Sequence, residues 1–211
     1  MRILFALSNG SYSYNISSCE KLLNTKLDIT FYCSEKLSDN NFKHLKIFVK
    51  KHKIKLYLYN ELKENNETID YKYLNHIEEK LNINIWKCIS VDRSLGRRYI
   101  QDLDGYKSKY ITKNQILSVA IKKLKFIEKT IISLKPEVVY WPTVVASYEA
   151  LIFDKICNER KIKFLTAIPY RIKNFFFYAK DMFYKYPHIQ NIYNNTKAKK
   201  TIFNLVSKFF K

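Results

Sequence analysis

The sequence predicts an α/β protein of the Rossmann-like class, built on a mainly parallel sheet of about five strands flanked by helices. Short apolar runs alternate with longer segments in which apolar residues recur at helical spacing. This β-α-β-α-β order requires parallel strands joined by crossover helices. At 211 residues and 47% hydrophobic composition, the chain can bury one full core. We expect a single Rossmann-like domain over residues 1–172, followed by a basic-aromatic helical extension over residues 173–211.

The N-terminal third supplies three strands and two helices. Apolar runs predict strands at 2–7, 27–33 and 54–59. Helical spacing predicts one helix that ends near residue 24 and another over 37–51. Ser38 or Asp39 is the expected N-cap of the second helix, whose apolar stripe is Phe42, Leu45, Phe48 and Val49.

The remaining elements follow a polar loop at 61–70. We expect a helix over 71–81 and a long helix over 113–134, which Thr112 caps and Pro136 ends. The next elements along the chain are a strand at 137–141, a helix at 147–159 and a strand at 162–168 that Pro169 closes.

A short segment after the 71–81 helical region concentrates charge. Three of the six arginines, Arg93, Arg97 and Arg98, fall within six residues beside Asp92 and Gly96. Arginine grips phosphate or carboxylate with two parallel hydrogen bonds, which lysine does not do. The segment therefore predicts an anion site. The alternative is structural: Asp92 pairs with Arg93 or Arg97 and braces a turn that Gly96 permits.

Three loops should meet at the carboxyl edge of the sheet, where Rossmann-like domains bind ligands. The first follows the first strand and offers backbone amides to an anion, through Asn9, Gly10, Ser11 and Tyr12. It lacks the glycine fingerprint of dinucleotide sites, and a plain strand-to-helix turn is the alternative. The second runs from 142 to Ser147, where a helix cap is the simpler interpretation. The third places Arg171 just past the fifth strand.

Charge and cysteine content restrict the class of protein. A formal net charge of +19 favours anionic partners, although abundant Lys, Asn, Ile, Tyr and Phe also suggest compositional drift. Four scattered cysteines without metal-ligand spacing indicate reduced core thiols of a cytosolic protein, and we expect no metal site. No apolar run is long enough for a signal peptide or a membrane span. None of the four histidines falls in a strand-end loop, and we expect each on the surface.

Four stretches together resemble the N-terminal half of bacterial capsule or surface-polysaccharide biosynthesis proteins, over roughly residues 1–175. They are Asp92-Arg93-x-Leu95-Gly96-Arg97, Lys109-Tyr110, Lys135-Pro136-Glu137-Val138-Val139 and Pro169-x-Arg171-Ile172. Members of that family look like glycosyltransferases with two facing Rossmann-like domains, the GT-B architecture. The resemblance implies that this chain is the acceptor-side half, while the partner domain holds most of the nucleotide-sugar donor.

The resemblance also implies residue roles and partners. Arg93, Arg97, Arg98 and Arg171 would bind phosphate or acidic sugar, and Asp92 would be a general base or would orient the arginines. The 211 residues leave no room for a complete donor domain, so we expect a separate donor-domain chain or a truncated reading frame. We expect no cofactor beyond the nucleotide-sugar donor of an assembled enzyme. The alternatives are a non-catalytic remnant and a single domain that binds anions or nucleic acid.

The last forty residues interleave aromatic residues with lysines. Such a surface suits an anionic bilayer, which would fit a lipid-linked glycan acceptor at the inner face of the membrane. The alternative is that these rings pack on a second domain or fold back as a crossover helix. The net charge and the 16% aromatic content make nucleic-acid binding a second hypothesis. The sequence disfavours it, because it shows no recognised RNA-binding motif, helix-turn-helix spacing or zinc module.

Overall fold

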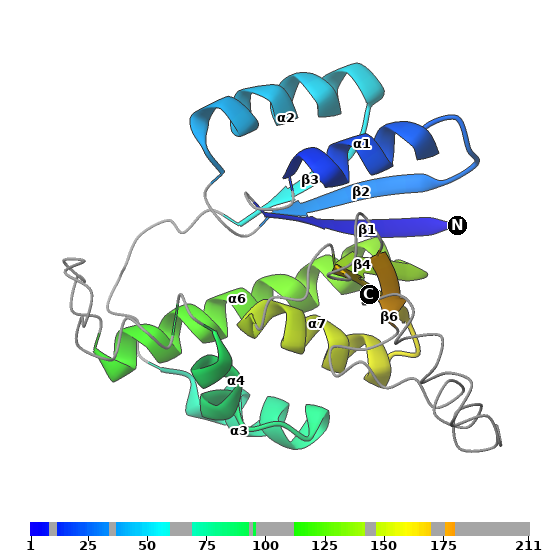
Figure 1. Cartoon of the computed structure of the whole chain (residues 1–211). Helices are drawn as coiled ribbons and strands as arrows, with labels where there is room; N and C mark the ends of the chain where they lie inside the picture. The colour runs from blue at the N-terminus through cyan, green and yellow to red at the C-terminus, as the bar shows by residue number, and fades with distance from the viewer. Residues whose placement is uncertain are drawn as a thin grey trace, which may run out of the picture.

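The computed structural model describes residues 1–8, 12–33, 37–59, 69–92, 95, 112–141, 147–169 and 176–179. It confirms the Rossmann-like α/β fold, with a six-stranded sheet in the order β3-β2-β1-β4-β5-β6 (Figure 1). The first five strands are parallel. Their bounds are β1 Arg2–Leu7, β2 Asp28–Cys33, β3 Lys55–Leu58, β4 Val138–Trp141 and β5 Lys163–Pro169.

The sixth strand corrects one sequence expectation. β6, Phe176–Ala179, pairs antiparallel with β5, although residues 173–211 were expected to form a helical extension outside the domain. Aromatic residues favour extended structure, and β5 would otherwise be an open edge of the sheet. The sheet therefore continues past residue 172, while the rest of the expected extension lies outside the described residues.

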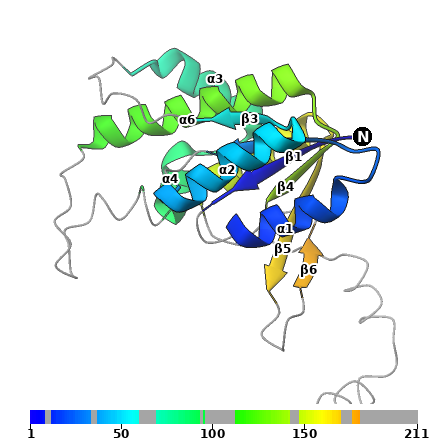
Figure 2. The ribbon, with the colours of Figure 1, turned by 90° about the horizontal axis from the view of Figure 1, so that it is seen from above.

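Helices cover both faces of the sheet (Figures 1 and 2). One face carries α1, Tyr12–Leu22, and α2, Asp39–His52, and the other carries α6, Lys113–Leu134, and α7, Tyr148–Glu159. Two further helices, α3, Tyr71–Leu81, and α4, Ile85–Val91, lie beside α6 and α7. The sequence predicted all of these except α4, whose seven residues are too few for a clear helical period.

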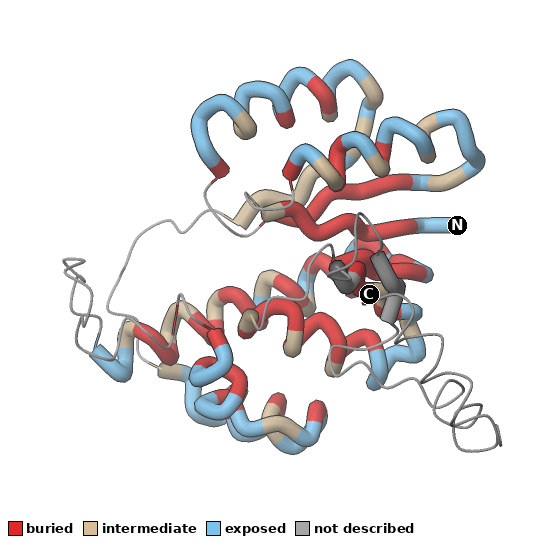
Figure 3. The backbone as a smooth tube through the Cα atoms, viewed as in Figure 1, coloured by how far each residue is buried: buried red, intermediate tan, exposed pale blue. Residues whose placement is uncertain are grey.

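The strands alternate between two cores because successive side chains of a strand point to opposite faces. Leu4, Ala6 and Tyr32 pack with α6 and α7, while Phe5 and Phe31 pack with α1 and α2. Seven apolar residues recur at helical spacing along α6 and form a buried stripe: Ile116, Leu117, Ala120, Ile121, Leu124, Ile127 and Ile131. Figure 3 shows the buried residues gathered in the strands and on the helix sides that meet them.

Helix ends follow the predicted capping chemistry. Ser38 caps α2 by accepting the Asn41 amide at 3.3 Å, which decides between the two N-caps that the sequence allowed. Thr112 and Gln115 form a reciprocal capping box at the start of α6. Each of these caps accepts hydrogen bonds from backbone amides that have no partner inside the helix.

The four cysteines are free and buried, as predicted for core thiols. Burial raises the pKa of the Cys19 thiol to about 11, and it raises the pKa of Cys157 well above its usual range. Thiols with such raised pKa values stay protonated at neutral pH and are poor nucleophiles. Burial therefore places all four cysteines in the core, and Cys19 and Cys157 are unreactive at neutral pH.

Candidate functional site at the carboxyl edge of the sheet

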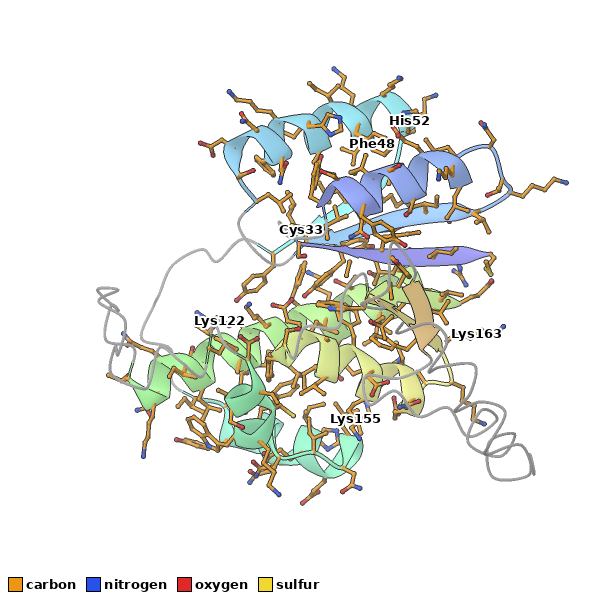
Figure 4. All side chains as sticks on the ribbon, in the orientation of Figure 1. Cys33, Phe48, His52, Lys122, Lys155 and Lys163 are labelled. Carbon is orange, nitrogen blue, oxygen red and sulfur yellow. The ribbon has the colours of Figure 1, made fainter. Side chains whose placement is uncertain are left out.

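The parallel strands end together along one edge of the sheet. The strand order reverses between β1 and β4, since β2 and β3 lie on one side of β1 while β4 and β5 lie on the other. Ligands of open α/β sheets bind at this switch point, outside the carboxyl ends of the strands. The residues near this edge are Leu7 of β1, Cys33 of β2, labelled in Figure 4, and Trp141 of β4.

A buried charged pair, Lys123 and Glu149, lies between the two helices on one side of this edge. Lys123 is on α6 and Glu149 is in the first turn of α7, and Lys123 Nζ lies 2.6 Å from Glu149 Oε1. Their side chains are only 9% and 6% exposed. Charges removed from water to this degree persist only when they are paired and hydrogen-bonded. The pair therefore fixes α6 against the start of α7.

Two tyrosines connect the buried charged pair to the strand ends. Tyr32, the penultimate residue of β2, donates its hydroxyl hydrogen bond to Glu149 Oε2 at 3.5 Å. The ring of Tyr59, just after β3, lies with its centroid 6.0 Å from Lys123 Nζ. The Tyr59 amide also donates to the Cys33 carbonyl at 2.8 Å, which keeps it beside the end of β2. The charged pair is thereby placed at the carboxyl ends of β2 and β3.

Asp92, the first residue of the predicted anion segment, is buried and bound to backbone amides. Its Oδ1 accepts the Leu95 amide at 3.0 Å, and its Oδ2 accepts the Tyr148 amide at 2.8 Å. Tyr148 is the first residue of α7, where Ser147 also acts as the N-cap. Asp92 and Leu95 are thus held against the N-terminus of α7, one residue from Glu149.

Tyr148 links the start of α7 to α6. It is fully buried, and its hydroxyl donates to the Ala120 carbonyl of α6 at 2.9 Å. Burial raises the pKa of the Tyr148 phenol well above its ordinary value, so the group stays a neutral hydrogen-bond donor. The start of α7 is therefore held by Asp92, Ser147 and Tyr148 together.

Tyr12, predicted as a ligand group of the first loop, is the first residue of α1 and is buried. Its hydroxyl lies 2.8 Å from His44 Nδ1 of α2, and the two rings meet edge to face. Burial, with a smaller Coulombic contribution from Cys33, raises the pKa of Tyr12 to about 12. The structure thus shows Tyr12 joining α1 to α2.

The remaining predicted site residues lie outside the described residues. They are Asn9, Gly10, Ser11, Arg93, Gly96, Arg97, Arg98 and Arg171. Ser147 is a helix cap, as its simpler interpretation predicted. His44 and His76 are exposed, as predicted, whereas His52 is half-buried and His188 falls in a range that the structure leaves undescribed.

Sequence reasoning missed the buried charged pair. A signal was present, because Lys123 sits among the apolar residues of the α6 stripe, one turn after Ala120 and next to Leu124. A lysine at such a position needs a buried anion. The sequence alone does not say that the anion is Glu149.

The described ranges contain neither a cluster of potential metal ligands nor a helix suited to cross a membrane. No group of three or more His, Cys, Asp or Glu side chains in them is arranged to hold a metal ion. No helix among them combines the length and apolar character needed to cross a bilayer.

Comparisons with known proteins show little at the level of sequence. No protein-family model matches the chain, and no curated protein matches it. Among solved structures, it is similar to a UDP-GlcNAc 2-epimerase from Neisseria meningitidis crystallised with UDP-GlcNAc, at 8% identity and a TM-score of 0.43. The match covers 82% of this chain and 34% of the epimerase chain. The chain therefore spans about a third of the length of that enzyme.

Proposed function

We propose that this chain is the acceptor-side half of a glycosyltransferase of capsule or surface-polysaccharide biosynthesis, with a phosphate-binding site at the carboxyl edge of its sheet. The donor-binding domain that the reaction requires would come from a further polypeptide segment, and the nucleotide-sugar donor would bind in the assembled enzyme. We also propose a cytoplasmic location at the inner face of the membrane, which the four free thiols support.

One observation carries the proposal. Asp92 and Leu95, which flank Arg93 in the sequence, are held against the N-terminus of α7 at the carboxyl edge of the parallel strands. A helix N-terminus favours an anion, and arginine is the side chain best suited to grip phosphate. The residues that we propose for ligand binding are Asn9, Gly10, Ser11, Tyr12, Arg93, Gly96, Arg97, Arg98 and Arg171.

The role of Asp92 separates two forms of the proposal. As a general base, it would take the proton of the acceptor hydroxyl. Both of its carboxylate oxygens accept backbone amides, however, which favours a second candidate function: an anion-binding domain without catalysis. In that case Asp92 only braces the arginine-rich segment.

Binding measurements on matched variants test the proposal. Calorimetry and thermal shift would compare UDP-sugars, nucleoside diphosphates and polyprenyl-phosphate sugar mimics on the wild type and on an Arg93→Ala/Arg97→Ala variant. The control is Arg2→Ala/Arg160→Ala, which removes the same charge from exposed positions at the opposite, amino edge of the sheet.

We expect saturable binding by the wild type and the control, and at least ten-fold weaker binding by the Arg93/Arg97 variant. Equal losses in both double variants, or no saturable binding by the folded chain, would overturn the proposal. Transfer of sugar once a donor domain is supplied would favour the enzyme, whereas ligand binding with no transfer would favour the anion-binding domain.

A further inference from the structure

The outer face of α2 concentrates positive charge. Lys43, Lys46, Lys50 and Lys51 are all exposed, and they surround Ile47, which is 67% exposed. At about 100° of rotation per residue, these five side chains fall within about 140° of one another around the helix. We call these five residues the α2 basic face.

The inner side of α2 fixes the direction of this face. Leu45 and Phe48 are buried in the core beneath the helix, and the Phe48 and His52 rings lie 4.7 Å apart there (Figure 4). Figure 3 shows the opposite side of α2 exposed along its length, pointing away from the sheet. Because the packed side is occupied, the α2 basic face is presented outward by the fold.

No acidic side chain in the described part of the chain neutralises the lysines of this face, although Lys46 Nζ lies 4.4 Å from the centroid of the Phe42 ring on the same helix. Among the described residues, no salt bridge involves the lysines of α2. The single acidic residue of the helix is Asp39, in its first turn. Exposed Lys53 and Lys55 continue the positive charge just beyond the last turn.

We propose that the α2 basic face docks the protein on an anionic bilayer. An interfacial helix binds by placing an apolar side chain among the lipid headgroups while basic residues around it meet anionic lipid. Ile47, with four lysines around it, has this arrangement. The proposal rests on α2 alone and is independent of the proposed glycosyltransferase function.

Nucleic acid is the other polyanion that such a face could meet. The helix carries no arginine, the side chain that grips phosphate and guanine with two hydrogen bonds. Its exposed apolar residue is aliphatic and offers no ring on which a base can stack. An aliphatic side chain gains free energy when it enters a bilayer interface. The observations therefore favour lipid.

Vesicle binding of two charge-matched variants tests the proposal. The first replaces all four lysines of the α2 basic face with glutamine. The second makes the same change at Lys72, Lys87, Lys129 and Lys163, exposed lysines on α3, α4, α6 and the start of β5. Vesicles of equal phosphatidylglycerol and phosphatidylcholine are compared with pure phosphatidylcholine at about 0.1 M salt, where charges separated by more than about 10 Å are largely screened.

Each lysine near an anionic surface contributes about five-fold in affinity, so the α2 variant should bind the anionic vesicles more than about a hundred-fold more weakly. The control variant should stay within about five-fold of the wild type. Equal losses in both variants, unchanged binding by the α2 variant, or equal binding to neutral vesicles would overturn the proposal. Loss of oligonucleotide binding with vesicle binding intact would instead assign the face to nucleic acid.

A second readout does not depend on affinity. An Ile47→Cys variant carries a polarity-sensitive fluorophore, and labelling is selective because the four native cysteines are buried. Its emission should shift to the blue when anionic vesicles are added. The control is Ile132→Cys on α6, which is 52% exposed on the opposite layer and should show no shift. A shift at Ile132 and none at Ile47 would contradict docking through α2.

Discussion

Replacing Lys123, the positive member of the buried charged pair, should lower the stability of the fold substantially. In a Lys123→Met variant the aliphatic stem is nearly retained, but Glu149 keeps its charge in a site where its side chain is only 6% exposed. Breaking a buried pair in this way costs about 3–5 kcal/mol. For a chain of this size, that corresponds to a fall in melting temperature of about 6–20 °C.

A double-mutant cycle isolates the interaction from the loss of packing. Glu149→Gln alone leaves Lys123 buried without its anion and should also destabilise the fold. The Lys123→Met/Glu149→Gln variant leaves neither charge, so it should be more stable than the sum of the single changes predicts, by about 1–3 kcal/mol. Urea unfolding followed by circular dichroism measures all three variants.

A surface pair whose lysine lies on the same helix as Lys123 supplies the control. Lys125 Nζ lies 3.3 Å from Asp70 Oδ2, but both side chains are 49% exposed. Exposed pairs contribute little to stability, so Lys125→Met should change the unfolding free energy far less than Lys123→Met. If the two variants lose equal stability, or if the cycle shows no interaction between Lys123 and Glu149, the reasoning about the buried charged pair is refuted.

Three further changes test single features of the structure. Asp92→Ala should lower the free energy of unfolding, measured in urea, by about 3 kcal/mol, because two buried amides lose a charged acceptor. An unchanged free energy would show that Asp92 does not stabilise the start of α7. Thr30→Val should raise the free energy of unfolding by about 1 kcal/mol, because the buried Thr30 hydroxyl has no hydrogen-bond partner among the described residues. A loss of stability would instead show that the hydroxyl has a partner. The folded state raises the pKa of Tyr12 from its ordinary value of 10.0 to about 12, and so favours the neutral phenol. The stability that this shift contributes is fully present below pH 10 and is lost as the pH rises from 10 to 12. Urea unfolding across that range should show a shallower decline for Tyr12→Phe than for the wild type, and equal slopes would contradict the assignment.

Much of the fold follows from local pattern. The α6 helix was predictable from end to end because its apolar residues recur at helical spacing, Thr112 caps it and Pro136 follows it. The five parallel strands were predictable from short apolar runs between such helices. β6 was not, because its residues become a strand only where β5 offers an edge with which to pair.

The contacts made by the described candidate residues were not predictable from the sequence. Asp92 stood out in the sequence as the acidic residue of an arginine-rich segment. Its contact with the Tyr148 amide joins residues 56 positions apart, and no local pattern indicates that distance. Tyr12 was likewise chosen for its place in a strand-end loop, whereas its contact with His44 depends on how α1 lies beside α2.

By itself, the sequence determined the order and type of most elements, their caps and the fold class, because hydrophobic period and capping act over a few residues. Only the tertiary structure decided that Lys123 meets Glu149, that Asp92 braces α7 and that α2 turns its lysines outward. Each of these depends on which faces of separate helices pack together. A buried charge or a buried amide is stable only beside a partner that packing brings to it.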